Sequence, residues 1–487
     1  MKKYLTILLL LVSISLNATI KWVTPRGNDS NNGADSASTG AWGTWDKAFS
    51  TAVAGDTVYF RGGVYYAIAS GNIYEVGHSG SDGNYINFWA YPPDYEAGNY
   101  PIFDFGRIQS ADYTYILRAR LDSYIHWKGL EIRNVTNTAT FKYVVPVYIE
   151  DSHHLIVENL RVHHISGPAI LSVGCTETYI KNCDVWEICD TLNPNPGQNG
   201  SGIGVNTRLD QWGDDMYDAK VYVEGCRAWN CSDQGFANTG VGYHEWKNCW
   251  TFSNGRLEGD GMGMKLSIST ASSTVNPLSR VYKNCIFAVN AGTGWDVNNC
   301  GGNVMNGHYY NNFIYRNGYK PWVSYYQNYY IGTGIWICGY ASGEPHPAPN
   351  EIYLNNISYD NEKGTGGAYV ASDIWKHENN SWDQTGLTVT DDDFISLDTL
   401  ELYRPRKADG SLPDIDFGKL AAGSDLIDAG APEVVTTNYN IPLPYNGTAP
   451  DLGWFEYEEE EEEGTGIKII KHNGKIIKHN GKFVIIN

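Results

Sequence analysis

Charged residues and methionine are scarce in this sequence. Charged residues make up only 18% of the 487 residues, and there are 5 methionines. Hydrophobic residues make up 42%, which excludes an intrinsically disordered chain. The 53 glycines, 35 tyrosines and 16 tryptophans favour strands and turns over helices.

Basic residues are also in short supply. The chain has 35 Lys and Arg against 55 Asp and Glu, for a formal net charge of −20. A nucleic-acid-binding protein needs a basic surface, which the sequence does not offer, so we expect no nucleic-acid partner. An acidic protein that acts on an acidic polymer must obtain positive charge at its site from a Lys, an Arg or a metal.

Long apolar runs are limited to one, at the N-terminus. Leu5–Leu16 is apolar, follows two lysines and ends before Asn17-Ala18. This pattern predicts a secretory signal peptide over residues 1–18, too short to span a membrane. No other stretch is long and apolar enough to cross a bilayer. We therefore expect a soluble monomer that is secreted or held at the cell surface.

The 9 cysteines lack the spacings of a metal or disulfide framework. Their odd number argues against complete disulfide pairing, and the absence of a CxxC pair argues against a zinc site. Four of them recur in one local context and are predicted to stack as small buried residues in a core: Cys183, Cys226, Cys249 and Cys285.

A strand-like phrase of six residues recurs through the middle of the chain. Its copies start 23 to 44 residues apart, and most carry Asn or Gly at the third position. They are WKGLEI (127–132), VENLRV (157–162), IKNCDV (180–185), VEGCRA (223–228), WKNCWT (246–251), YKNCIF (282–287), YYNNFI (309–314) and YLNNIS (353–358). Coils of about 23 residues with two or three strands are typical of a parallel β-helix. We therefore predict an all-β solenoid over residues 19–457 rather than a sandwich or a propeller.

The composition changes after residue 457. Six consecutive glutamates open a segment, 458–466, that is predicted to be a solvated linker. Residues 467–487 contain the unit KIIKHNG twice, which predicts a small β-hairpin appendage.

One strand of each central coil begins after a glycine, which allows the strands to be aligned. Because side chains of a strand alternate between its faces, the alignment predicts three rows. The inward row is Ile203, Phe236, Met264 and Trp295; the first outward row is Gly204, Ala237, Lys265 and Asp296; the second is Asn206, Thr239, Ser267 and Asn298. Lys265 and Asp296 would then lie on adjacent coils, about 5 Å apart at the backbone.

Lys265 is a candidate catalytic base. A Lys on the exposed face of a sheet is usually a solvated charge, but this one lies in GDGMGMKL (259–266), between turns rich in Gly and Asp. A Lys base must lose its proton near neutral pH, which requires desolvation or a neighbouring cation.

The central coils resemble the right-handed parallel β-helix polysaccharide lyases of family 9, the pectate and rhamnogalacturonan lyases. The matching segments are residues 182–205, CRAWNCSDQGF (226–236), GDGMGMKL and GWDVNN (294–299). AFSTAVAGDTVYF (48–60) is similar to the opening segment of such proteins, where a short helix caps the core and the first coil begins at GDTVYF. The resemblance implies that Lys265 is the base and that Asp233 is a calcium ligand.

The calcium site of that family uses four Asp residues, and three of them are replaced here. Ser201, Gln234 and Ala237 stand at those positions, and only Asp233 remains. Calcium prefers six to eight oxygen ligands with several charges among them. We therefore expect a weak or substrate-assisted calcium site made by Asp233, Gln234 and Ser201, with Asp190 or Asp260 supplying further charge.

The leading hypothesis is a lyase that acts on an acidic, uronate-containing polysaccharide. Lys265 would remove the proton α to a uronate carboxyl group, while a metal or Arg256 neutralises that carboxylate and Asp296 and Asn298 contact the sugar.

Two alternatives remain open. A glycoside hydrolase would need two carboxylates about 5 to 9.5 Å apart, and Asp233, Asp260 and Asp296 offer candidates. A non-catalytic glycan-binding module would use aromatic side chains, such as Trp322 and Trp336, to stack on sugars.

Overall fold

The structure is a computed structural model that describes residues 18–458, with internal gaps, and two short strands beyond them. The residues outside this description are 1–17, 68–72, 107–108, 111, 139–143, 193, 207–218, 241, 268–279, 299–306, 320–331, 338–339, 342–343, 346–350, 366–375, 436–439, 459–470, 473–474 and 477–487. The predicted signal peptide except Ala18, nearly all of the acidic linker and most of the tail therefore lie outside the described residues.

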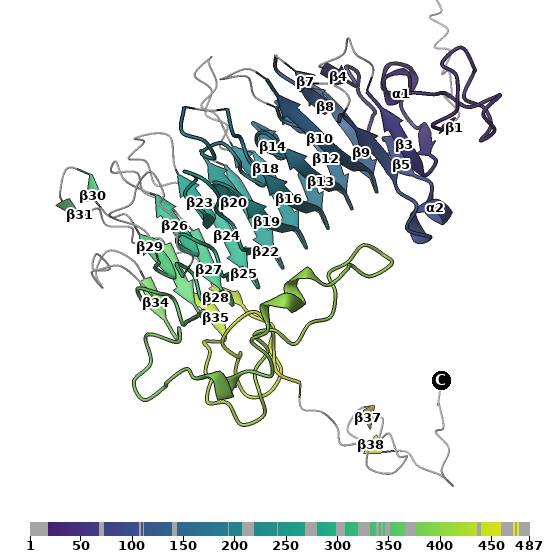
Figure 1. The fold of residues 1–487 in the computed structure, drawn as a ribbon. Coiled ribbons are helices and arrows are strands. Elements are labelled where there is room, and N and C mark those ends of the chain that lie inside the picture. The colour runs from purple at the N-terminus through teal and green to yellow at the C-terminus, as the bar shows by residue number, and fades with distance from the viewer. Residues whose placement is uncertain are drawn as a thin grey trace, which may run out of the picture.

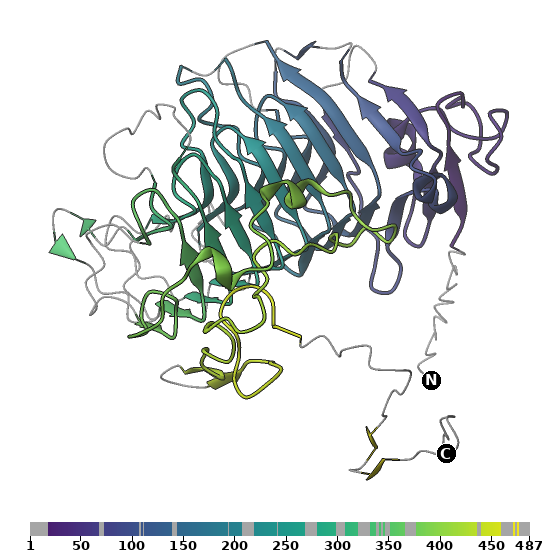
Figure 2. The same cartoon turned by 60° about the horizontal axis from the view of Figure 1, so that its bottom comes forward.

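Three long parallel sheets, here called sheets A, B and C, form the body of the protein (Figures 1 and 2). The chain passes from A to B to C and returns to A one coil further along, where each strand pairs in parallel with its equivalent in the previous coil. This is the parallel β-helix that the repeated phrases predict.

Sheet A contains β1 (Ile20–Val23), β2 (Thr57–Phe60), β5 (Ile86–Ala90), β9 (Ser123–Lys128), β12 (His153–Glu158), β15 (Thr178–Lys181), β18 (Lys220–Glu224), β21 (Tyr243–Lys247), β24 (Arg280–Lys283), β27 (Gly307–Tyr310), β32 (Glu351–Leu354) and β34 (Lys376–Glu378). Sheet B contains β3 (Gly63–Tyr66), β6 (Pro101–Asp104), β7 (Gln109–Ser110), β10 (Glu131–Asn137), β13 (Arg161–Ile165), β16 (Asp184–Ile188), β19 (Arg227–Cys231), β22 (Trp250–Phe252), β25 (Ile286–Ala288), β28 (Phe313–Tyr315) and β33 (Ile357–Tyr359). Sheet C contains β4 (Ile73–Glu75), β8 (Tyr115–Arg120), β11 (Val147–Glu150), β14 (Ile170–Val173), β17 (Ile203–Asn206), β20 (Gln234–Thr239), β23 (Met262–Ser267), β26 (Trp295–Asn298) and β29 (Ile335–Ile337).

Short antiparallel pairs and helices complete the described elements. The pairs are β30 (Tyr340–Ala341) with β31 (Glu344–Pro345), β35 (Glu433–Val435) with β36 (Asn440–Pro442), and β37 (Lys471–His472) with β38 (Lys475–Ile476). The helices are α1 (Trp45–Thr51), α2 (Pro92–Glu96), and the 3-10 turns η1 (Asp391–Asp393) and η2 (Thr399–Tyr403). The pair β37–β38 confirms the predicted C-terminal β appendage. No helix in the described part of the chain is long and apolar enough to span a membrane.

The repeated phrases lie in register on successive coils, as predicted. Trp246 pairs with Tyr282, and Tyr309 pairs with Tyr353. The third residue of every copy has a left-handed backbone, with φ between 52° and 74°: Gly129, Asn159, Asn182, Gly225, Asn248, Asn284, Asn311 and Asn355. Gly and Asn tolerate this conformation better than other residues, which explains their recurrence at the turn from sheet A to sheet B.

The residue after this turn points into the core and stacks along the helix axis. Cys183, Cys226, Cys249 and Cys285 are buried free thiols, which confirms the predicted stack. The column continues with asparagines, in which Asn312 Nδ2 donates to Asn356 Oδ1 at 2.9 Å and Asn356 Nδ2 donates to Asn380 Oδ1 at 2.8 Å. These bonds satisfy polar groups that would otherwise be costly to bury.

Helix α1 covers the N-terminal end of the core. Thr44 caps the helix by accepting a hydrogen bond from Lys47 N at 3.1 Å, and Trp45 and Phe49 are buried against the first coils. The opening differs from the expectation in one respect. Sheet A begins at β1, before α1 and before GDTVYF, because Ile20–Val23 pairs in parallel with β2.

The segment from residue 387 to 458, here called the strap, runs back across the outer face of sheet B (Figure 1). Leu402, Phe417 and other apolar strap residues pack on the buried side chains of Trp250 and Phe313. Arg227 Nη1 also donates to the carbonyl oxygens of Leu402 and Arg404, at 3.0 and 2.8 Å. Apolar burial and charge-assisted hydrogen bonds therefore both hold the strap on the solenoid.

Glu351 is an ionisable group inside the core. It is fully buried, and its Oε2 accepts a hydrogen bond from Tyr353 Oη at 3.3 Å, while its Oε1 has no hydrogen-bond partner. Burial raises the pKa of Glu351 to about 8, although the Tyr353 bond opposes the shift.

Glu351→Gln should therefore alter how stability depends on pH. The unfolded chain ionises Glu351 near its usual pKa and the folded chain does so only at about 8, so wild-type stability should fall as the pH rises between these values. Between pH 5 and pH 8, the free energy of unfolding of the variant should fall by roughly 1 to 3 kcal/mol less than that of wild type. Chemical denaturation at both pH values measures this difference. Glu224→Gln, on the exposed face of sheet A, is the matched control; equal pH dependence in all three proteins would contradict the assignment.

Candidate active site

The register of sheet C places Lys265 as the alignment predicts. Lys265 pairs with Ala237 on one side and Asp296 on the other, and Ala237 pairs with Gly204. The inward residues Ile203, Phe236, Met264 and Trp295 are buried in the core. On the upstream coils of this row, Ala237 is partly exposed, whereas Gly204 is buried and the side chain of Leu171 lies next to it.

Three carboxylates surround the amine of Lys265. Its Nζ lies 3.0 Å from Asp260 Oδ2, and Asp260 N donates to Asp233 Oδ1 at 3.3 Å. Asp233, Asp260 and Asp296 are buried, while the Lys265 side chain is 28% exposed. One reachable amine therefore lies within a buried acidic cluster.

The cluster shifts the proton affinity of its members. Burial, and then the charge of Asp260, raise the pKa of Asp233 to about 8. Burial also raises the pKa of Asp296 to about 7, against the opposing effect of Lys265. Burial acts to lower the pKa of Lys265, but Asp260, Asp233 and Asp296 outweigh it and hold that pKa above its usual value. Shifts of this kind concentrate at functional sites.

The predicted calcium positions lie next to this cluster. Asp233 is buried directly before β20, and Gln234 Nε2 donates to Ser201 Oγ at 2.5 Å. Gln234 Oε1 is buried and has no hydrogen-bond partner. The fourth position, Ala237, contributes no oxygen from its side chain.

The remaining predicted residues do not all join the cluster. Asp190 is buried and holds its own loop, with Oδ1 accepting from Leu192 N at 3.0 Å, and no contact with Asp233 is found among the described residues. Arg256 is 49% exposed, and its Nη1 lies 2.6 Å from Glu187 Oε2, on a strand of sheet B. Asn298 pairs with Ser267 through the backbone, and its side chain lies outside the described residues.

Comparison with known proteins identifies the family. A family model described as "Pel9A-like, right handed beta helix region" matches residues 21–330, more than half of the chain. The chain belongs to the Pel9A-like right-handed β-helix family. A second model, described as "Rhamnogalacturonan lyase-like, C-terminal", matches residues 373–453, which include most of the strap. The resemblance seen in the sequence is thereby confirmed, as is the right-handed β-helix.

Individual relatives agree with this assignment. The chain is 30% identical over 455 residues to pectate lyase L of Dickeya dadantii (strain 3937), covering 90% of each chain. It is 26% identical over 446 residues to pectate lyase L of Paenibacillus polymyxa (strain SC2), covering 86% of this chain and 85% of the relative. Two solved structures share the fold at 24% identity. Pectate lyase Pel9A aligns with a TM-score of 0.65, and the alignment covers 90% of this chain and 96% of Pel9A. A rhamnogalacturonan lyase aligns with a TM-score of 0.70, and the alignment covers 83% of this chain and 97% of that lyase.

The acidic cluster of this Pel9A-like chain offers the kind of oxygen donors that calcium prefers. Buried acceptors without hydrogen-bond partners include Gln234 Oε1, Asp260 Oδ1 and Asp296 Oδ1. A divalent cation would satisfy such atoms, and carboxylate and amide oxygens are its preferred ligands. No three acidic, His or Cys side chains among the described residues form a ready-made cage. The donor set therefore fits a cation that is held weakly, through Asp233, Asp260 and Gln234.

Asp260 is the residue of the cluster whose contact the sequence does not predict. The sequence makes it a candidate calcium ligand or hydrolase carboxylate, whereas in the structure it is the ion-pair partner of Lys265. The only sequence signal for this contact is that Asp260 lies five residues before Lys265. Asp260 precedes the strand β23, so the alternation of side chains along a strand does not predict where its carboxylate points.

Asp260→Asn should lower the pKa of Lys265, because Asp260 contributes the largest of the effects that raise it. We expect the rate of Lys265 modification by an amine-reactive reagent, followed by mass spectrometry at pH 9, to rise by about tenfold, the effect of one pKa unit. Asp104→Asn, which removes a carboxylate paired with Arg133 on sheet B, is the control and should leave that rate unchanged. An unchanged rate in Asp260→Asn would exclude the proposed electrostatic coupling.

Proposed function

We propose that this chain is a secreted polysaccharide lyase that cleaves an acidic, uronate-containing polysaccharide by β-elimination. Relatives named pectate lyase L over nine tenths of the chain, and the rhamnogalacturonan lyase-like C-terminal region, support lyase activity. The observation that carries the proposal is the amine of Lys265, whose side chain is 28% exposed and lies among buried carboxylates next to Ala237. Export rests on the apolar N-terminal run.

Lys265 acts as the general base. The amine must be neutral to act, and the charges of Asp260, Asp233 and Asp296 oppose this form. In its neutral form it removes the proton from the carbon α to the uronate carboxyl group, and the electron pair of that bond forms a carbon–carbon double bond. The glycosidic oxygen on the neighbouring carbon leaves with the bonding electrons and takes up a proton. Asp296, which pairs with Lys265 on the next coil, and Asn298 are the residues that we expect to contact the sugar.

The substrate carboxylate needs a positive partner, because its charge opposes loss of the neighbouring proton. Bound calcium would supply this charge, and Asp233, Asp260 and Gln234 are the residues that would hold it. Arg256 is the less suitable partner, since its contact is with Glu187 on sheet B and not with the acidic cluster around Lys265.

The decisive experiment is a screen of acidic polysaccharides for the absorbance of an unsaturated product. Absorbance that grows with time supports the lyase. A new reducing end without the double bond would indicate a hydrolase that uses the carboxylates of the same cluster. Binding without any new chain end would indicate a glycan-binding module.

Lys265→Ala should reduce elimination by at least about a hundredfold, because the lost amine transfers the proton. Lys265→Arg should be nearly as inactive, since a guanidinium does not give up its proton. Substrate affinity, measured by calorimetry, should remain close to wild type in both variants. Wild-type turnover in either one would remove Lys265 from the mechanism.

Calcium affinity should be low and should rise when missing carboxylates are restored. We expect wild-type activity to increase with added calcium and to be lost with a chelator. Gln234→Asp combined with Ala237→Asp should strengthen calcium binding by at least about tenfold in calorimetry, because each adds charge beside Asp233. Asp233→Ala should also cost more activity than Arg256→Ala. If Arg256→Ala instead cost more activity than Asp233→Ala, and a chelator had no effect, Arg256 would be the group that neutralises the substrate carboxylate.

A further inference from the structure

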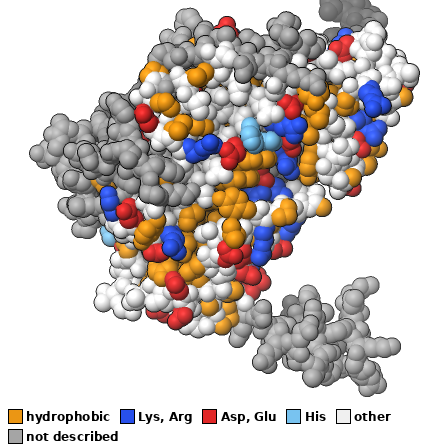
Figure 3. All heavy atoms as spheres, in the orientation of Figure 1, with side chains coloured by type: hydrophobic (Ala, Val, Ile, Leu, Met, Phe, Trp, Pro, Cys, Tyr) orange, Lys and Arg blue, Asp and Glu red, His pale blue; other side chains and the backbone are white. Residues whose placement is uncertain are grey.

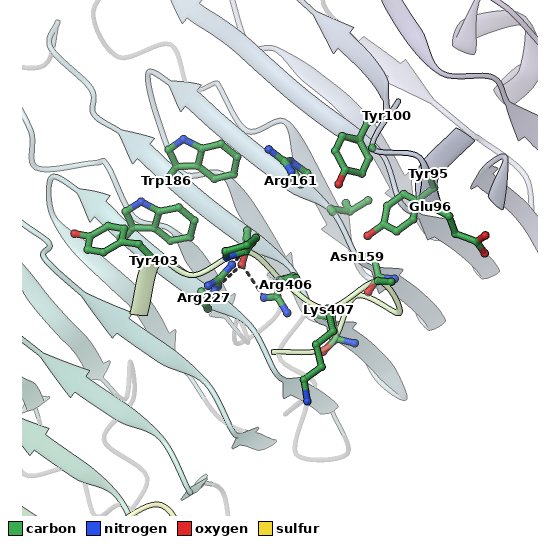
Figure 4. Close-up of a pocket in the computed structure, with 17 residues that line it drawn as sticks. Tyr95, Glu96, Tyr100, Asn159, Arg161, Trp186, Arg227, Tyr403, Arg406 and Lys407 are labelled. Atoms are coloured by element: carbon green, nitrogen blue, oxygen red, sulfur yellow. Dashed lines mark hydrogen bonds and ion pairs between the residues drawn. The ribbon is translucent and has the colours of Figure 1, made fainter. Parts of the chain in front are cut away.

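A groove lies on sheet B, where the strap crosses it (Figure 4). Its volume is about 490 Å³, and its walls come from β13, β16 and β19, from the region of α2 and from strap residues 403 and 405–408. Lys265 and the acidic cluster belong to sheet C and to the turns that lead into it, so the groove is a separate feature. Figure 3 shows Lys and Arg side chains among hydrophobic ones on the face seen in Figure 1.

Two half-buried indoles line the groove. Trp186 stacks on Trp229 with ring centroids 5.1 Å apart, and His163 stacks on the other side of Trp186 at 4.1 Å. Their ring faces are therefore occupied, and their edges face outward. Neither indole N–H has a hydrogen-bond acceptor among the described residues, and neither nitrogen is buried. The groove thus offers two unused donors on a rigid column of rings.

Arg161 is held between two aromatic rings. Its guanidinium carbon lies 4.7 Å from the ring centroid of Tyr100 and 5.5 Å from that of Trp186, as Figure 4 shows. Its Nε lies 3.1 Å from Glu131 Oε2, while its two terminal nitrogens donate no hydrogen bond among the described residues. The side chain is 40% exposed. A guanidinium fixed in this way presents two parallel N–H groups, the geometry that binds a carboxylate in bidentate fashion.

The charges around the groove favour an acidic ligand. Four cationic side chains and two carboxylates line it, in a chain with a net charge of −20. Arg227 and Arg406 share Asp184 and hold the strap, so Arg161 and Lys407 are the cations left to meet a ligand. Glu131 is itself shared between Arg133 and Arg161, and the Lys407–Asp414 pair is exposed at both ends and therefore weak.

We infer that this groove is a second, non-catalytic binding site for the uronate residues of an acidic polysaccharide. Arg161 holds a sugar carboxylate, Lys407 adds positive charge at the strap, and the indole N–H groups of Trp186 and Trp229 donate to hydroxyl oxygens. The ligand class rests on the proposed function, whereas the site rests on the groove alone. Such a site would keep a long polymer on the enzyme between cleavage events at sheet C.

The test counts binding sites in a chain that does not consume the ligand. Calorimetry of the Lys265→Ala protein with a galacturonate hexamer should give two molecules bound per chain. Adding Arg161→Gln should leave one bound hexamer per chain. Arg161→Lys should weaken the second site by about tenfold, because Lys keeps the positive charge but lacks the two parallel N–H groups of a guanidinium. A neutral glucose hexamer should not bind in the groove.

Arg133→Gln is the matched control, since it removes the same charge next to the same Glu131 but lies outside the groove. It should leave both molecules bound. If Arg161→Gln fails to fold, Lys407→Gln, at a side chain that is 46% exposed, replaces it and should selectively weaken the second site. The inference would be overturned if the Lys265→Ala protein bound one hexamer or none. It would also be overturned if the protein with both Lys265→Ala and Arg161→Gln bound two hexamers with unchanged affinity. Failure of the lyase proposal would show separately, as no unsaturated product from wild type.

Discussion

The structure depends on parallel pairing between equivalent strands of successive coils. This pairing sets a repeat of about 4.8 Å, so a residue at one position of a coil must lie against the residue at the same position of the next. Equal side chains therefore stack, as the cysteines and asparagines do inside and the indoles of Trp186 and Trp229 do outside. The same register can bring unlike side chains together, as it does for Ala237, Lys265 and Asp296.

The chemistry of the acidic cluster follows from crowding charges at this spacing. Burial, and then the charge of Asp260, raise the pKa of Asp233 to about 8, and burial raises the pKa of Asp296 to about 7. Lys265 relieves part of this repulsion and is held protonated in return. The amine and a cation would thus compete for the same carboxylates, which couples the basicity of Lys265 to the charge around it.

Sequence reasoning succeeded where the coil repeat determines position and was less successful at the turns. The inward row, the adjacency of Lys265 and Asp296, and the Asn or Gly at the left-handed turn all follow from strand alternation and backbone sterics. The Asp260–Lys265 pair and the Arg256–Glu187 pair depend on the paths of turns between sheets B and C, which no periodicity describes. The groove needs the strap, whose return across sheet B depends on contacts between residues far apart in sequence, such as Asp184 and Arg406.

The strap also has a consequence for how this solenoid can change in length. A bare β-helix can gain or lose one coil with little effect on distant coils, since each coil contacts only its neighbours. Here Arg227 on β19 and Phe313 on β28 both contact the strap, and Asn355 accepts a hydrogen bond from Ala431 N at 2.8 Å near the far end. Inserting or removing a coil between these points would shift one end of the strap by a full coil relative to the other. The central coil number is therefore fixed by a segment outside the repeat.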